Sequence, residues 1–64
     1  MIVNGETTAI ESGQTILGFL HRLNLAPDRV AIELDRQIVK RDKWETTQLQ
    51  DGAKLEIVHF VGGG

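Results

Sequence analysis

A chain of 64 residues has room for one small domain, which buries only about 60% of the surface that its unfolded chain exposes. The absence of cysteine excludes disulfides, thiolate metal sites and a nucleophilic thiol, and it indicates the cytoplasm rather than an oxidising compartment. A net charge of −2 without a basic stripe argues against nucleic acid as a partner, and no apolar run approaches the ~18 residues of a membrane span.

The first predicted element is a β-hairpin. Asn4-Gly5 is the dipeptide best suited to the positive φ angles of a type I′ turn, and it separates residues 1–3 from residues 6–10. We therefore expect these two segments to pair as antiparallel strands.

The second element is a helix over residues 16–23, in which apolar side chains recur at three- and four-residue spacing. Thr15 can cap its first turn, Asn24 can take the left-handed conformation that ends a helix, and Pro27 prevents the helix from resuming. Gly18 costs about 1 kcal/mol relative to alanine inside a helix, and close packing is the favoured explanation for it.

The remaining elements are predicted from alternation and turn signals. They are a strand over 30–34, a turn at Asp35-Arg36, a strand over 37–39, a short helical turn over 46–49, a turn over 50–52 and a last strand over 55–61.

This element order predicts an α+β fold in which a mixed sheet of about five strands packs on one helix. A single helix can cover only one face of the sheet. The β-grasp, or ubiquitin-like, arrangement meets this condition, and in it the first and last strands lie side by side and run parallel. We expect one domain over residues 1–61, followed by a flexible glycine tail over residues 62–64.

The uncovered face of the sheet is a candidate docking surface. Alternation along the last strand places Leu55 and Ile57 toward the helix, and Val58 and Phe60 on the opposite face, near Ile2. Exposed apolar clusters often mark protein interfaces. Scattered exposed apolar residues are also normal in monomers, and that alternative stays open.

The body of the domain offers no recognisable catalytic or metal site. His21 and His59 lack the spacing of metal ligands, and the aspartates fall in predicted turns rather than in a carboxylate pair. Trp44 is interpreted as a lid over the small core, with a binding hot spot as the alternative. Beside it, Arg41 and Lys43 are either partner contacts or solvated loop residues.

The chain closes on three glycines, Gly62, Gly63 and Gly64, which arise by chance at a given place roughly once in 3,000 sequences. Three extended residues without side chains reach roughly 10 Å and can enter a channel that admits only backbone. The tail could therefore carry a terminal carboxylate into the active site of another protein. The alternatives are a frayed terminus and a linker remnant.

Three segments together resemble one family. They are residues 27–34, residues 38–39 and, above all, residues 51–64, which read DGAKLEIVHFVGGG. The chain resembles the ThiS family, the small sulfur carrier proteins of thiamine biosynthesis, over essentially its whole length. Gly62 is one glycine more than a minimal diglycine ending, and it lengthens the tail without removing the reactive terminus.

The resemblance implies a carrier that is not itself an enzyme and binds no cofactor. An E1-like adenylyltransferase of the ThiF type would use ATP and Mg²⁺ to adenylate Gly64. Sulfur from a persulfide, supplied by a cysteine desulfurase, would replace AMP and leave a thiocarboxylate, and a thiazole synthase of the ThiG type would take the sulfur for the thiazole ring. Gly62 and Gly63 would supply reach, and Val58, Phe60 and Ile2 would dock.

Three other functions remain open at this point. The small subunit of molybdopterin synthase uses the same terminal thiocarboxylate, although it is typically longer. A ubiquitin-like modifier would instead be joined to lysines through its terminal glycine. A plain interaction module would make no use of the tail.

Overall fold

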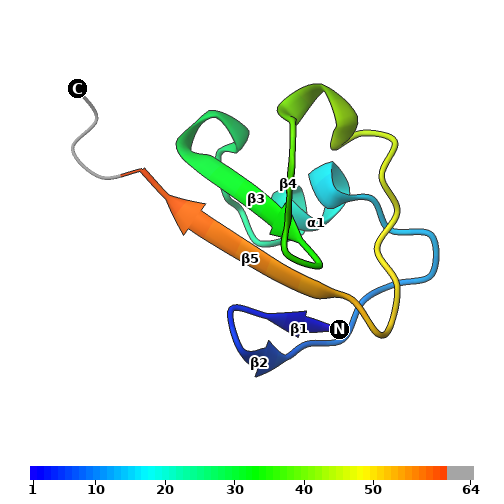
Figure 1. The fold of residues 1–64 in the computed structure, drawn as a ribbon. Helices are drawn as coiled ribbons and strands as arrows, with labels where there is room; N and C mark the ends of the chain where they lie inside the picture. The colour runs from blue at the N-terminus through cyan, green and yellow to red at the C-terminus, as the bar shows by residue number, and fades with distance from the viewer. Residues whose placement is uncertain (61–64) are drawn as a thin grey trace.

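A computed structural model describes residues 1–60 as a mixed sheet with one α-helix on one of its faces (Figure 1). The elements are, in chain order, β1 (Ile2–Val3), β2 (Glu6–Thr7), α1 (Ile16–Arg22), the 3₁₀ turn η1 (Pro27–Arg29), β3 (Val30–Leu34), β4 (Gln37–Val39), the 3₁₀ turn η2 (Arg41–Lys43) and β5 (Lys54–His59). Within this part of the chain the sheet has five strands in the order β2-β1-β5-β3-β4. The α+β, β-grasp prediction is confirmed.

The central strand of the sheet is β5. It pairs in parallel with β1, where Val3 lies opposite Leu55, and antiparallel with β3 along the whole length of that strand, from Val30 opposite His59 to Leu34 opposite Leu55. The expected parallel contact between the first and last strands is therefore present.

Two tight hairpins join neighbouring strands. In the first, Asn4 and Gly5 have φ angles of 48° and 84°, as a type I′ turn requires, which confirms the prediction. In the second, Asp35 and Arg36 have φ angles of 51° and 72°, although neither is glycine. Asp35 is supported there because its backbone N–H donates to the carbonyl of Lys54 at 2.8 Å and its Oδ1 accepts from the Lys54 N–H at 2.9 Å.

Helix α1 is closed at both ends by the expected residues. The Gly18 N–H donates to Thr15 Oγ1 at 3.1 Å. At the other end Asn24 has a φ of 60°, and the Leu25 N–H donates to the carbonyl of Leu20 at 2.9 Å in a Schellman motif. The helix ends at Arg22, one residue before the predicted end, because Leu23 already serves as its C-cap.

Three local predictions were wrong. β2 ends at Thr7 rather than at residue 10. The helical turn expected over residues 46–49 forms earlier, at η2, and the later segment instead runs alongside the start of α1, where Gln48 forms a bridge with Thr15. The close contact expected at Gly18 comes from the helix's own cap, because a Cβ there would lie 3.3 Å from Thr15 Oγ1 with no other element nearby.

The core lies between α1 and the sheet. Its buried apolar residues include Ile16, Phe19 and Leu20 of the helix, which are 0% exposed, and they pack against β3 and β5. Burying such a side chain contributes about 1.5–3 kcal/mol. Trp44 is 2% exposed and its Nε1 donates to the carbonyl of Val39 at 2.8 Å, which confirms its predicted role as a lid.

Candidate functional site

The face of the sheet opposite α1 carries the exposed apolar residues that the sequence predicted there. Ile2 is 38% exposed, Val58 54% and Phe60 56%, whereas Leu55 and Ile57 are buried on the helix side. The strand alternation was therefore assigned to the correct faces. Whether these three side chains dock a partner stays a prediction.

Sequence reasoning missed a fourth apolar residue on this face, Ile38 in β4. It is 79% exposed and lies opposite Glu33 of β3, which in turn lies opposite Glu56 of β5. The signal was present, because Val39 packs against the core and its neighbour must then point the other way. We call Ile2, Ile38, Val58 and Phe60 together the open-face patch.

The side chain of Asn4 holds the backbone of β5 directly before Val58, a member of the open-face patch. β1 makes its last backbone bond to β5 where the Asn4 N–H donates to the carbonyl of Leu55 at 2.9 Å, and the chain then turns away. The Asn4 amide replaces the missing strand: its Oδ1 accepts from the Ile57 N–H at 2.7 Å and its Nδ2 donates to the Ile57 carbonyl at 3.2 Å. The backbone N–H and carbonyl of Ile57, the residue before Val58, therefore both have hydrogen-bond partners on this edge of β5.

The ladder on the other edge of β5 continues beyond the strand itself, because the Phe60 N–H donates to the carbonyl of Arg29 at 2.9 Å. Backbone pairing therefore reaches the last residue that the structure describes. The predicted tail, Gly62 to Gly64, lies outside the described residues, as does Val61. The assignment of Gly64 as the modified residue remains a prediction.

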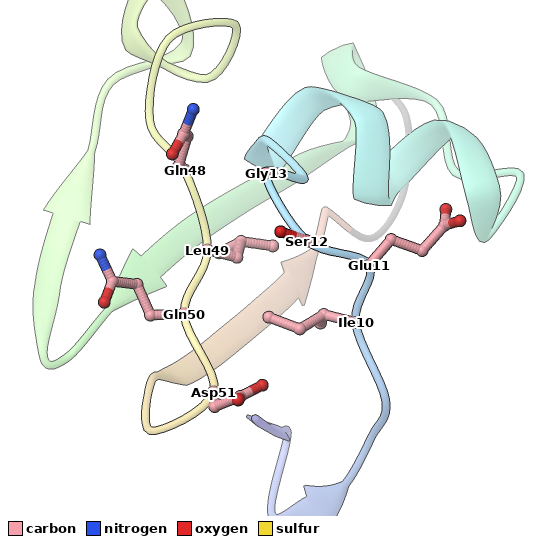
Figure 2. A pocket seen from close by; sticks show the side chains of 8 residues that line it. All are labelled: Ile10, Glu11, Ser12, Gly13, Gln48, Leu49, Gln50 and Asp51. Carbon is pink, nitrogen blue, oxygen red and sulfur yellow. The ribbon is translucent and has the colours of Figure 1, made fainter.

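A pocket of about 390 Å³ lies near the start of β5, away from Phe60, between the loop before α1 and the segment before β5. Figure 2 shows Ile10 and Leu49 pointing into it, Ser12 and Asp51 near its rim, and Glu11 turned away. These groups include no base beside the hydroxyl and no cation for a phosphate. The arrangement supports neither nucleophilic catalysis nor nucleotide binding.

Within residues 1–60 no three histidine, cysteine, aspartate or glutamate side chains lie together so as to hold a metal ion. Arg41 and Lys43 are exposed, and the Arg41 guanidinium lies over the Trp44 ring at 5.9 Å from its centroid. Their contact with a partner stays untested. In the same part of the chain, no helix has the length and apolar character needed to cross a membrane.

Comparison with known proteins gives a consistent picture. The model of the ThiS family matches residues 1–64. A thiazole synthase of Magnetococcus marinus is 40% identical over 62 residues, which are 97% of this chain and 19% of that protein. The sulfur carrier protein ThiS of Escherichia coli is 27% identical over 64 residues, 100% of this chain and 97% of that one.

A solved structure agrees with the fold. The crystal structure of the thiamine biosynthesis protein ThiS from Geobacter metallireducens superposes with a TM-score of 0.82 at 27% identity, and covers 98% of this chain and 96% of the other. The chain spans only about a fifth of the length of the thiazole synthases it matches, so that similarity concerns one segment of those proteins.

Proposed function

The chain belongs to the ThiS family, and from this premise we propose that it carries sulfur for thiamine biosynthesis as a thiocarboxylate on Gly64. The observation that carries the proposal is the family match over residues 1–64, which includes the three glycines Gly62 to Gly64. The lack of a recognisable catalytic arrangement in the described body agrees with a carrier whose chemistry is performed by another protein.

Activation is the first step. A carboxylate is a poor acceptor for nucleophiles because it already carries the negative charge that attack would add. The adenylyltransferase, using ATP and Mg²⁺, joins the Gly64 carboxylate to the α-phosphorus of ATP and releases pyrophosphate. The resulting acyl-adenylate has AMP as its leaving group.

Sulfur transfer follows. The terminal sulfur of a persulfide, supplied by a cysteine desulfurase, attacks the Gly64 carbonyl carbon and AMP departs. A thiol then provides the two electrons that cleave the S–S bond, which leaves the thiocarboxylate on Gly64 and a disulfide elsewhere. The carrier needs no cysteine for this sequence, because the sulfur is held on the terminal carbonyl.

The open-face patch and the tail have different roles in these steps. The patch docks the folded body on the adenylyltransferase, while Gly62 and Gly63 bring Gly64 into the active site. A thiazole synthase then receives the same tail and takes the sulfur for the thiazole ring. The segment similarity to thiazole synthases supports that second partner. Because both enzymes need the same tail, they bind the carrier one at a time.

Two other functions use the same kind of terminus, the small subunit of molybdopterin synthase and a ubiquitin-like modifier. No contact in the described residues favours either. The match with the ThiS family and the nearly full-length similarity to a sulfur carrier support the thiamine assignment.

Intact-mass analysis after incubation with the adenylyltransferase, ATP, Mg²⁺ and a sulfide source tests the proposal. We expect a gain of about 16 Da as sulfur replaces oxygen. The matched control lacks Gly63 and Gly64, so that no diglycine ending is left, and it should remain unmodified while keeping its circular dichroism spectrum. An unchanged mass with an active enzyme would overturn the proposal, and adducts on lysine would favour the modifier.

A further inference from the structure

Two glutamates lie directly opposite each other among the exposed apolar side chains of the open face. The antiparallel register of β3 and β5 places Glu33 opposite Glu56, and the register of β3 and β4 places Ile38 opposite Glu33. The next pair of residues on the same face, two positions along each strand, is Ala31 and Val58. The acidic pair is therefore bordered by two members of the open-face patch.

This pairing is unfavourable for the isolated protein. Like charges directly opposite each other on a sheet are destabilising. In the described part of the chain, neither carboxylate takes part in a side-chain hydrogen bond. The cation on the same face of β5 is Lys54, two residues before Glu56 and opposite Ile2.

The spacing and the apolar neighbours of the two glutamates indicate which side chain of a partner would bind them. Cβ atoms directly opposite on antiparallel strands are about 4.5–5.5 Å apart, so one planar guanidinium can donate to both carboxylates. Apolar neighbours that exclude water on docking strengthen such charge-assisted bonds. Arginine is more weakly hydrated than lysine and presents its donors in a fixed fork, so it fits a site of two acceptors inside an apolar border.

We propose that Glu33 and Glu56 together receive an arginine side chain of the adenylyltransferase that docks on the open-face patch. This inference rests on the proposed function and adds the chemistry of the partner: an apolar surface with a guanidinium at its centre. The two carboxylates repel each other in the free carrier, and in the complex the attraction of each to the guanidinium offsets that repulsion. The pair therefore selects for a partner with a cation at this position and against apolar surfaces that lack one.

The test is the dependence of adenylation on carrier concentration, followed by pyrophosphate exchange. The double variant Glu33→Gln/Glu56→Gln should raise the KM for the carrier roughly tenfold or more, with kcat nearly unchanged. Glu33→Lys/Glu56→Lys should raise it further. The KM of the unsubstituted carrier should rise with salt, and that of the glutamine variant should rise less steeply.

The matched control is Glu11→Gln/Glu45→Gln, which removes the same charge from two exposed loop residues outside the sheet. Its KM should stay within about twofold of the unsubstituted value, and Glu33→Gln/Glu56→Gln should unfold at or above the unsubstituted midpoint. Equal KM values for Glu33→Gln/Glu56→Gln and Glu11→Gln/Glu45→Gln would overturn the acidic-pair proposal and leave the proposed function standing. Failure of the unsubstituted carrier to be adenylated would overturn both.

A second copy of the chain is the other occupant that the experiment can reveal. Light scattering at increasing concentration should give a monomer mass. A dimer that Phe60→Asp dissolves would show that the open-face patch is covered by another carrier, and it would overturn the proposal.

Discussion

Replacing Asn4 with glycine should lower the free energy of unfolding by about 1–3 kcal/mol. The estimate comes from two lost hydrogen bonds to the backbone of Ile57, at 2.7 and 3.2 Å, each contributing about 0.5–1.5 kcal/mol net. Glycine accepts the φ of 48° at this position without strain, so the turn itself is preserved and the change isolates the amide.

Urea and thermal unfolding followed by circular dichroism measure this change. For a domain of this size each kcal/mol corresponds to about 4–8 °C in Tm. Asn4→Asp is the matched intermediate, because it keeps an acceptor for the Ile57 N–H and loses the donor to the Ile57 carbonyl. We expect stability to fall from asparagine to aspartate to glycine. A glycine variant as stable as the unsubstituted protein would refute the idea that the amide replaces a strand.

Three further changes separate stability from docking. Phe60→Asp should weaken adenylation several-fold at limiting carrier while changing the free energy of unfolding by less than about 0.5 kcal/mol, because the side chain is 56% exposed; a large loss of stability in urea would contradict the face assignment. Arg36→Gly should raise stability by about 0.5–1 kcal/mol by relieving a φ of 72°, and an unchanged urea midpoint would argue against strain there. Leu20→Ala should cost about 2–5 kcal/mol, a large share of the whole stability of so small a domain, and a fully cooperative transition with a near-normal Tm would be inconsistent with its complete burial.

Local signals in the sequence were sufficient for the first turn, for the two ends of the helix and for the faces of the last strand. Asn4-Gly5 marked the first turn because both of its residues tolerate positive φ, and Thr15 and Asn24 marked the ends of the helix because their side chains or backbone angles satisfy helix termini. The faces of β5 followed from alternation alone.

Two of the missed features depend on contacts between distant parts of the chain. The bonds from Asn4 to Ile57 span 53 residues, and the pairing of Glu33 with Glu56 needs a register that no local pattern supplies. The helical turn lies at η2 rather than over residues 46–49, and Trp44, which directly follows η2, is buried in the core. These are tertiary requirements that override local preference.

The position of β5 also affects how the domain comes into being. It follows every other described strand in the chain yet lies at the centre of the sheet, between β1 and β3. Contacts between residues so far apart in sequence form late, and they lower the rate of folding. During synthesis, β1 and β3 have no common neighbour until β5 has left the ribosome, so a chain interrupted before that strand has no complete sheet and is open to proteolysis. The domain can therefore complete its fold only after β5, the strand that precedes the glycines in the sequence, has been synthesised.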